Sequence, residues 1–581
     1  MAKSKIEESF KKWQTSAKQD ADLIKELKEI ENNRAEIEDR FYKDLDFGTA
    51  GIRGIIGAGT NRMNVYVVGR ITQAFSIYLN KLKPNNLVAI SFDSRIKSEF
   101  FAKTAAQVFA ANGIKVKIFK ELKPVPILSY AVRHLNCDGG VMITASHNPS
   151  EYNGYKIYGN DGCQVLDDVA LKISDFIKNI DIFGFSFGNF EESAQNGLIS
   201  FCDDEIEQSF LNCVKKSLIQ PEILNYSAIN AAYTPLHGSG MEPVQRMLKK
   251  LHVGSVHIVE CQRYPNGNFP TCKSPNPEQF EVFNLAIEYC NKHNLDVAIA
   301  SDPDCDRVGV VVRQGVDDGY KILNGNQIGV LMLNYICQQR LEMGTMPKKP
   351  VAITTIVSTP MAEKIAAHYG IELQKVLTGF KYIGEKIGEF EKKGDQSRFI
   401  FGFEESQGYL AGSYVRDKDG VFAAMLICEM VAFYKNKFKK NLLDVLNELH
   451  NHFGHYKSVT QSIVLKGKHG LEQMMKIMDW FRTNRIDHIG GFKIYAKLDY
   501  FLSKAQCLSK NRSEIYSIKL PKSNVIEFRL KNKSKIIIRV SGTEPKIKIY
   551  YHVVGCNEKE ATELANKLQE SFTCFCNHIN Q

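Results

Sequence analysis

Four apolar runs in this chain, each with the pattern of a buried strand, end directly in polar loops, and this recurrence restricts the folds available to it. The loops begin near Thr144, Asp302, Glu404 and Ser541. Helical and extended patterns alternate before the first three of them, which favours mostly parallel sheets covered by helices. Because open α/β sheets bind ligands outside the carboxyl ends of their strands, the four loops could meet at one cleft.

The alternation also indicates how the chain divides. It begins with a helical stretch at 65–82, restarts near residues 211 and 322, and gives way after about residue 455 to a shorter segment of mixed helices and strands. A length of 581 residues, at roughly 150 residues per domain, corresponds to about four domains. Residues 4–44, with Leu23, Leu27 and Ile30 on one helical face, are predicted to form an amphipathic helical lead-in.

The composition narrows the possible partners and the compartment. The formal charge of +10 comes from 75 basic and 65 acidic side chains in short clusters, which fits a mildly basic surface or a preference for small anionic substrates. This distribution does not support nucleic-acid binding. The 14 cysteines include no CxxC pair, so free thiols in a reducing compartment are expected. The longest apolar run, 421–428, is too short to cross a bilayer, and we predict a cytoplasmic protein with no membrane partner.

The first polar loop places a serine at the exit of a strand. The apolar run 141–143 is followed by Ser146, by the imidazole of His147 and by an Asn-Pro turn signal. A hydroxyl held by a rigid element and exposed by a sharp turn suits a nucleophile or a phosphate carrier. The alternative is a plain turn in which the serine only bonds to the backbone. An extended segment after the turn could return Lys156 toward the serine.

The second loop carries three aspartates at alternate positions, Asp302, Asp304 and Asp306. In an extended segment these side chains lie on one side, and three hard oxygen ligands suit Mg²⁺. A calcium-binding EF-hand is disfavoured because Arg307 and Arg313 stand where that loop requires a glycine and a glutamate. The alternative is an acidic turn capped by Arg307.

The other loops offer groups that recognise hydroxyls and anions. Glu404–Glu405–Ser406 could hold neighbouring sugar hydroxyls, although solvated loop charges are the simpler interpretation. Residues 539–543 combine a guanidinium, two hydroxyls and backbone amides around a glycine, the elements of an oxyanion cradle. A glycine cluster at 47–54 includes Arg53, and the turn 416–420 includes Lys418. Together these loops provide what phosphoryl transfer to a sugar requires.

At this point the sequence resembles the α-D-phosphohexomutase superfamily. Thr144–Ala–Ser–His–Asn–Pro149 resembles its phosphoserine loop, and Asp302–Pro–Asp–Cys–Asp–Arg307 its metal loop. Gly402–Phe–Glu–Glu–Ser406 resembles its sugar-binding loop, and Arg539–Val–Ser–Gly–Thr–Glu–Pro545 its phosphate-binding loop. The loop 378–383 is similar to that of the phosphoglucomutase/phosphopentomutase branch.

The resemblance implies an α/β fold of four domains around a central cleft: three related α/β units with mixed, mostly parallel sheets and a smaller C-terminal α+β domain. The predicted domains are 1–210, 211–322, 323–454 and 455–581.

The resemblance also implies a mechanism. Phosphorylated Ser146 would donate its phosphoryl group to the sugar, and the resulting bisphosphate would turn end over end before its other phosphate returns to the serine. One Mg²⁺ per chain would be held by Asp302, Asp304, Asp306 and a phosphoserine oxygen. Lys156 resembles the general acid/base, with its pKa lowered by neighbouring cations.

The remaining candidates would contact the substrate. His147, Lys418 and Arg307 would assist at the transferring group, and Glu404 and Ser406 would hold sugar hydroxyls. The non-reacting phosphate would be held by Arg539, Ser541, Gly542 and Thr543, and further substrate contacts are expected from Arg53, Gly379 and Lys381.

The expected reaction is the interconversion of glucose 1-phosphate and glucose 6-phosphate, with glucose 1,6-bisphosphate as activator. The same chemistry could serve ribose or deoxyribose phosphates or the synthesis of glucose 1,6-bisphosphate, and mannose phosphates are a weaker alternative. A metal-dependent phosphatase would hydrolyse the phosphoserine, and a non-catalytic sugar-phosphate-binding protein would not need Ser146, Lys156 and three aspartates together. A monomer or weak homo-oligomer is expected.

Overall fold

The computed structural model describes residues 2–48, 51–225, 229–253, 256–315, 319–464, 467–508, 513–540 and 546–580. The chain forms two compact units. Unit 1 comprises Met1–Gly325, Phe380–Ile400 and Ser406–Asn441, and unit 2 comprises Asn326–Gly379, Phe401–Glu405 and Leu442–Gln581. Among the described residues, no helix combines the length and apolar character needed to cross a membrane.

Unit 1 begins with three helices in the region predicted to form an amphipathic helical lead-in: α1 (Ala2–Ser16), α2 (Ala21–Glu29) and α3 (Arg34–Phe41). The breaks fall where polar residues cap the next helix, since Asp20 accepts the N–H of Asp22 and Asn33 accepts that of Glu36. The predicted apolar face is correct, because Leu23 and Leu27 belong to a buried cluster.

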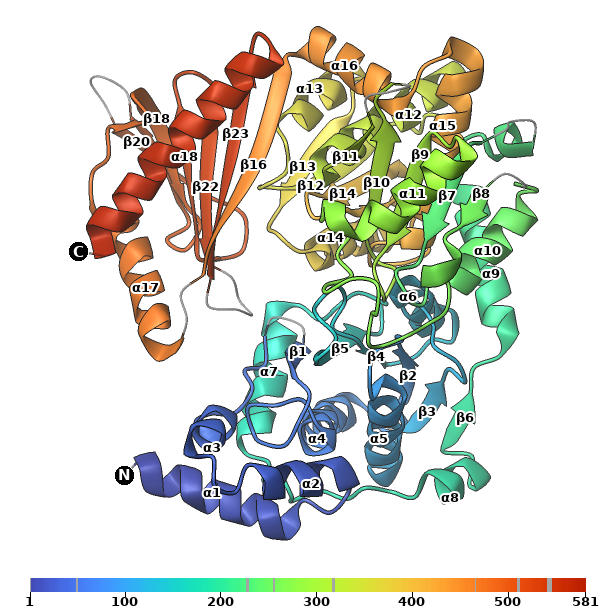
Figure 1. Ribbon diagram of the computed structural model, residues 1–581, viewed down its shortest axis with the longest axis vertical. Helices are drawn as coiled ribbons and strands as arrows, with labels where there is room; N and C mark the ends of the chain where they lie inside the picture. The colour runs from blue at the N-terminus through green and yellow to red at the C-terminus, as the bar shows by residue number, and fades with distance from the viewer. Residues whose placement is uncertain are drawn as a thin grey trace. The chain divides into compact units, whose positions relative to one another are not determined.

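The first sheet of unit 1 has six strands in the order β1-β5-β4-β2-β3-β6 (Figure 1). Its strands are β1 (Gly51–Ile55), β2 (Leu87–Phe92), β3 (Lys115–Ile118), β4 (Gly139–Ile143), β5 (Tyr152–Gly159) and β6 (Ile199–Phe201). Strands β4, β2, β3 and β6 are parallel, and β5 runs antiparallel to both β4 and β1. The sheet is therefore mixed and mostly parallel, as predicted.

Helices cover both faces of this sheet. The helices of this region are α4 (Val65–Leu82), α5 (Ser98–Ala111), α6 (Val125–His134), α7 (Asp167–Lys178), α8 (Phe190–Gln195) and α9 (Asp204–Ser217). Helices α4 and α5 lie on one face and α6 on the other, as Figure 1 shows. Since parallel strands with both faces covered are almost wholly apolar, functional groups are left to the loops at the strand ends.

The second sheet of unit 1 has the order β11-β10-β9-β7-β8. Its strands are β7 (Ala231–Thr234), β8 (Val256–Ile258), β9 (Val297–Ser301), β10 (Val308–Arg313) and β11 (Tyr320–Leu323). Unit 1 also contains α10 (Met241–Lys250), α11 (Asn284–His293), α14 (Phe380–Lys392), the short strand β15 (Gly408–Leu410) and the buried helix α15 (Gly420–Phe438). The parallel strands β8, β7 and β9 direct their carboxyl ends to one edge, from which the aspartate loop emerges after β9.

Unit 2 contains a smaller sheet with β13, β12 and β14 in that order, and a large antiparallel sheet. The elements of the first are α12 (Gly325–Glu342), β12 (Val351–Thr355), α13 (Met361–His368), β13 (Glu372–Val376), β14 (Phe399–Glu404) and α16 (Leu442–Phe453). Strands β12 and β13 are parallel, which continues the α/β pattern.

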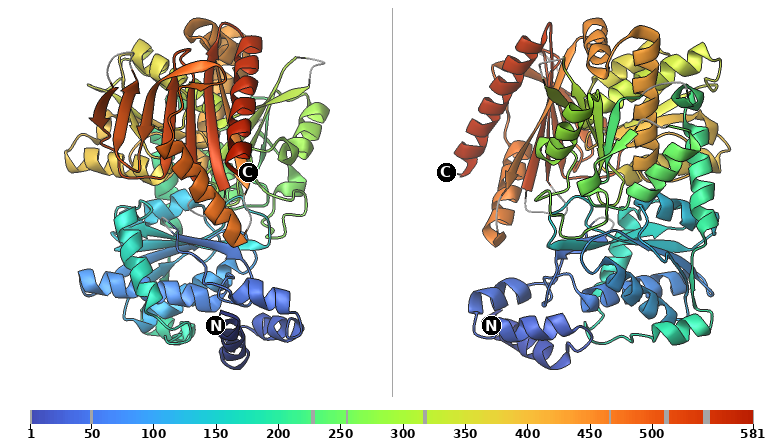
Figure 2. Two further views of the ribbon diagram at one scale, coloured as in Figure 1. Left: turned by 90° about the vertical axis from the view of Figure 1, so that its left-hand side faces the viewer. Right: turned by 45° about the vertical axis from the view of Figure 1, so that its right-hand side comes forward.

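The large sheet of unit 2 has eight strands, and all of its pairings are antiparallel. The order is β16-β23-β22-β21-β18-β19-β20, and β17 pairs with β18. Its elements are β16 (His455–Val464), α17 (Gly467–Thr483), β17 (His488–Ile489), β18 (Phe492–Asp499), β19 (Lys504–Leu508), β20 (Ser513–Ser517), β21 (Val525–Leu530), β22 (Lys535–Val540), β23 (Lys546–Gly555) and α18 (Glu558–Asn580). Helices α17 and α18 pack on one face, which Figure 2 shows from the side.

Candidate active site

Ser146 follows β4 in a left-handed backbone conformation, with φ of 52°, which is uncommon for a residue other than glycine. Its N–H donates to Thr144 Oγ1 at 2.8 Å, and the Arg95 guanidinium donates to its carbonyl oxygen at 2.6 Å. The Arg95 side chain is fully buried and also donates to the carbonyls of Pro149 and Tyr152, at 2.8 and 2.9 Å. A buried cation thus holds the sharp turn, and strained backbone of this kind is typical of functional sites.

The Ser146 hydroxyl contacts a second loop. It donates to Asp302 Oδ2 at 2.7 Å, and its oxygen lies 3.1 Å from His147 Nδ1. Burial, reinforced by the positive charges of Arg307 and Arg53, holds the pKa of His147 well below its usual value. The imidazole next to the serine is therefore uncharged at neutral pH.

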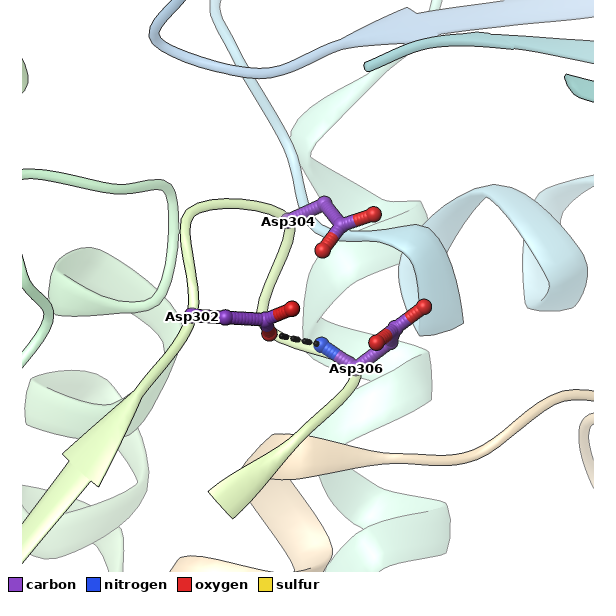
Figure 3. A group of neighbouring side chains, drawn as sticks. All are labelled: Asp302, Asp304 and Asp306. Atoms are coloured by element: carbon purple, nitrogen blue, oxygen red, sulfur yellow. Dashed lines mark hydrogen bonds between the residues drawn. The ribbon is translucent and has the colours of Figure 1, made fainter. Parts of the chain in front are cut away.

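The three aspartates lie in the loop between β9 and β10, and one carboxylate oxygen of each lies within 4.8 Å of those of the others (Figure 3). The expected grouping is correct, but the extended segment proposed for it is wrong. The loop turns, with Cys305 at φ 48°, and Asp302 Oδ1 accepts the N–H of Asp306 at 3.1 Å and of Arg307 at 3.0 Å. A closed turn, not strand alternation, brings the carboxylates together.

The donor set of this cluster fits a divalent cation. Asp304 Oδ1 and Asp306 Oδ1 are buried, and within the described part of the chain neither has a hydrogen-bond partner. Burial, together with the charges of Asp304 and Asp306, raises the pKa of Asp302 well above its usual value. A cation with a preference for oxygen would satisfy the two unpartnered atoms and relieve the repulsion, and an all-carboxylate set suits Mg²⁺.

Lys156 lies on β5 opposite Met142 of β4, and its Nζ contacts Asp304 at 2.8 Å and Asp306 at 3.1 Å. The prediction of a lowered pKa is wrong for this arrangement. Burial does lower the pKa of Lys156, but the carboxylates of Asp304 and Asp306 outweigh it, so the net shift is upward. Lys418 and Arg53 act in the predicted direction with a smaller effect.

Lys418 also reaches the cluster, with its Nζ 3.0 Å from Asp306 Oδ2. The residues on either side fix its loop: Asp417 accepts a hydrogen bond from Tyr158 at 2.9 Å, and Asp419 caps α15 through the N–H groups of Val421 and Phe422. Burial raises the pKa of Asp306, but the charges of Lys156, Lys418 and Arg307 outweigh it and lower the pKa overall.

Four further candidates also belong to unit 1. Arg53 donates to the Asn148 side chain at 3.2 Å, and Arg307 donates to Glu278 at 3.2 Å. Lys381 pairs with Asp167 at 2.6 Å, and Ser406 is half-buried. The segment 378–383 was predicted to be a loop, but α14 begins at Phe380, so Lys381 lies in the first turn of a helix.

Unit 2 carries the other candidates. Glu404 ends β14 and is 4% exposed, and Gly379 has φ of 119°. Burial and the neighbouring Glu404 raise the pKa of Glu405, against the opposing charges of Arg539 and Lys548. Arg539 donates to Tyr550 Oη at 3.4 Å. The other members of the predicted phosphate cradle, Ser541, Gly542 and Thr543, lie outside the described residues.

Asp93 and Arg95 are functional candidates that were not predicted from the sequence. Strands β2 and β4 are parallel neighbours with Phe92 opposite Ile143, so the loop after β2 lies beside the serine loop. Asp93 Oδ2 accepts the hydroxyl of Thr144 at 2.6 Å. The signal was present, because Asp93 and Arg95 also follow an apolar strand directly.

A strand-end serine bonded to a carboxylate cluster, with lysines at its side, is typical of phosphoryl-transfer enzymes. Three family models match: Phosphoglucomutase/phosphomannomutase, alpha/beta/alpha domains I, II and III, over residues 44–182, 208–315 and 324–453. The chain belongs to this family, within the α-D-phosphohexomutase superfamily, which confirms the resemblance and the three α/β domains. The predicted domain boundaries and central cleft stay predictions.

Relatives named phosphoglucomutase match over most of the chain. A phosphoglucomutase from Staphylococcus haemolyticus (strain JCSC1435) is 36% identical over 514 residues, 88% of this chain and 91% of the relative. One from Staphylococcus aureus (strain MRSA252) is 36% identical over 535 residues, 90% and 92% of the two chains. The crystal structure of pp63/parafusin, a phosphoglucomutase from Paramecium, has a TM-score of 0.67 at 17% identity, over 92% of this chain and 96% of that one, and supports the fold alone.

Proposed function

We propose that this chain is a phosphoglucomutase that interconverts glucose 1-phosphate and glucose 6-phosphate through a phosphoserine at Ser146 and a glucose 1,6-bisphosphate intermediate. The observation that carries the proposal is the 2.7 Å bond from the Ser146 hydroxyl to Asp302, within a cluster where Asp304 and Asp306 each keep a buried oxygen with no hydrogen-bond partner among the described residues. Family membership and relatives named phosphoglucomutase support the reaction.

Ser146 carries the transferable group in this proposal. The hydrogen bond that its N–H donates to Thr144 and the one that its carbonyl accepts from Arg95 hold its backbone, so the oxygen keeps one position while phosphate leaves and returns. Lys156 is the candidate acid/base for the sugar hydroxyl, on the basis of its place beside the serine loop and the resemblance. The uncharged imidazole of His147 and the positive charges of Lys418 and Arg307 belong to the same cluster of side chains as Ser146 and the aspartates. They would stabilise negative charge on the transferring phosphoryl group.

The three aspartates would hold the metal. Asp302, Asp304 and Asp306, with an oxygen of the phosphorylated serine, would supply its ligands. Bound Mg²⁺ would neutralise charge on the transferring phosphoryl group. Asp302 contacts the serine in the unphosphorylated protein, so phosphorylation would exchange a hydrogen bond for a shared cation.

The remaining residues would bind the sugar and its non-reacting phosphate. Glu404 and Ser406 would accept protons from sugar hydroxyls, and Arg539 with Ser541, Gly542 and Thr543 would hold the non-reacting phosphate. Arg53, Gly379 and Lys381 are candidate substrate contacts. The electrostatic interaction of Arg539 with Glu405 supports recognition of a ligand with both hydroxyls and a phosphate. Glucose 1,6-bisphosphate would restore phosphoserine and so act as activator, in a cytoplasmic setting that suits the 14 cysteines.

The substrate is tested with a panel of glucose, mannose, N-acetylglucosamine and ribose 1-phosphates, each with and without added 1,6-bisphosphate. The proposal expects the highest kcat/KM for glucose 1-phosphate and one phosphate on Ser146 by mass spectrometry. A higher kcat/KM for ribose 1-phosphate would make the chain a phosphopentomutase. Net accumulation of bisphosphate would make it a synthase, and release of free phosphate at the turnover rate would make it a phosphatase.

A further inference from the structure

Thr144 joins the serine loop to the metal loop. Its side chain is fully buried, and its Oγ1 has three polar neighbours on three different segments. It accepts the N–H of Ser146 at 2.8 Å, and it shares its one proton between Asp93 Oδ2 at 2.6 Å and, more weakly, Asp304 Oδ2 at 3.2 Å. One hydroxyl thus contacts the backbone of the phosphate carrier and the carboxylate of a candidate metal ligand.

The Thr144 hydroxyl cannot easily turn away from this arrangement. The other oxygen of Asp93 already accepts the Arg95 N–H at 3.0 Å and the Ser98 hydroxyl at 2.7 Å, so the carboxylate that receives the Thr144 proton is itself fixed. All of these groups are shielded from water, where an unmet hydrogen bond is expensive.

The contact with Asp304 has a directional consequence. Asp304 Oδ2 accepts the weaker branch of the shared Thr144 hydrogen bond at 3.2 Å and a hydrogen bond from Lys156 Nζ at 2.8 Å. Asp304 Oδ1, in contrast, is buried and has no hydrogen-bond partner within the described residues. Holding one oxygen on the protein side determines where the other points, which is how partners of metal ligands commonly tune affinity.

We propose that Thr144 is a positioning residue that couples the phosphoserine loop to the metal site, because its hydroxyl orients Asp304 while it fixes the backbone of Ser146. The inference rests on the proposed function, since it assumes that the aspartates hold a cation and that Ser146 carries phosphate. If the proposal is correct, both the backbone conformation of Ser146 and the affinity of the aspartates for a cation depend on the Thr144 hydroxyl.

The chain offers matched variants for a test. Thr144→Val removes the hydroxyl at nearly constant volume, and Thr144→Ser restores it. Thr72 of α4 is an equally buried control, whose hydroxyl bonds to the Val68 carbonyl at 2.8 Å and the Tyr155 hydroxyl at 3.0 Å. Thr72→Val therefore also removes a buried hydroxyl from unit 1, but one that has no hydrogen bond to an aspartate in the described residues.

The first measurement is Mn²⁺ binding to the unphosphorylated full-length protein by isothermal titration calorimetry, because Mn²⁺ accepts the same oxygen ligands as Mg²⁺. Thr144→Val is expected to bind Mn²⁺ about 10- to 100-fold more weakly than wild type. Thr144→Ser should recover most of the affinity, and Thr72→Val should match wild type even if its melting temperature falls. Equal affinities of Thr144→Val and Thr72→Val would overturn the inference.

The second measurement is the rate at which 1,6-bisphosphate phosphorylates Ser146 at saturating Mn²⁺, followed by mass spectrometry. In Thr144→Val, phosphorylation of Ser146 should remain slow even when saturating Mn²⁺ compensates for the weaker metal binding, because the Ser146 N–H has lost its acceptor. A phosphorylation rate equal to that of wild type would contradict the coupling. If Thr144→Val does not fold, Asp93→Asn perturbs the same hydroxyl, and wild-type Mn²⁺ affinity in that variant would overturn the inference. A wild-type protein that binds Mn²⁺ but lacks mutase activity would contradict the proposed function alone.

Discussion

The candidate residues of unit 1 and those of unit 2 are held in different ways. In unit 1 the serine, the aspartates and Lys156 are buried and bonded to one another, at distances such as 2.7 Å from Ser146 to Asp302. In unit 2 the carboxyl group of Glu405 interacts electrostatically with Arg539, whose hydrogen bond to Tyr550 is longer, at 3.4 Å.

This difference indicates a division of tasks. Groups that must be correctly placed at the moment of bond breaking gain from a rigid, dry setting, because reorganisation then adds little to the barrier. Groups that recognise a ligand need donors and acceptors whose best partner is the ligand itself. Substitutions in unit 1 should therefore lower kcat, and substitutions in unit 2 should mainly raise KM.

The largest effect is expected at Ser146. Ser146→Ala removes the phosphate carrier, so kcat should fall by about 10⁴-fold or more, as for other nucleophiles that act covalently. Binding of glucose 1-phosphate, followed by calorimetry, should remain measurable. Ser150→Ala, a half-buried hydroxyl in the same loop, is the control and should keep wild-type kcat. Substantial turnover by Ser146→Ala would remove the serine from the mechanism.

A smaller but still large loss is expected for Asp304→Asn. This change removes a charge from the cation site, and metal ions stabilise transferring phosphoryl groups by several kcal/mol, so kcat should fall on the order of 10²- to 10³-fold. The measurement is the rate as a function of Mg²⁺ concentration. Asp296→Asn, which removes a carboxylate paired with Lys435 at 2.6 Å on the same unit, should leave the Mg²⁺ dependence unchanged. The metal assignment fails if both variants behave alike.

These expectations draw on parts of the structure that the sequence predicts well. The helix at 65–82 has the predicted bounds, because a long periodic run determines its own secondary structure. The polar loops follow from the same pattern, since buried parallel strands leave functional groups to their ends. The serine and the aspartates could therefore be identified before their contacts were known.

The contacts themselves could not be predicted in the same way. The direction of the Lys156 pKa shift depends on Asp304 and Asp306, which lie about 150 positions away and approach only when two sheets pack together. The turn at Cys305 depends on neighbours as well, because a Cβ on Gly420 would lie 2.5 Å from the Cys305 carbonyl. Local patterns contain no information about such approaches.

The contrast between the units is tested most directly in unit 2. Arg539→Met should raise the KM for glucose 1-phosphate by about 10- to 100-fold, since a hydrogen bond to a charged group contributes about 1.5–3 kcal/mol. The kcat should change little if Arg539 binds the non-reacting phosphate equally in ground and transition states. Arg529→Met, on the neighbouring strand β21 and paired with Glu527 at 2.7 Å, is the matched control. A loss confined to kcat would contradict the division of tasks.

The smallest expected effect tests whether that division extends to residues that do not touch the reacting groups. Ser274 lies in the loop before α11, and its hydroxyl donates a hydrogen bond to the His147 carbonyl at 2.7 Å. This bond connects the serine loop to the part of unit 1 that contains the second sheet. Ser274→Ala loses one hydrogen bond worth about 0.5–1.5 kcal/mol, and kcat should fall by up to about tenfold with KM unchanged. Steady-state kinetics against Ser150→Ala separates the two parameters. A raised KM at constant kcat would mean that the rigid setting of unit 1 serves binding rather than transfer, because only interactions that strengthen in the transition state appear in kcat.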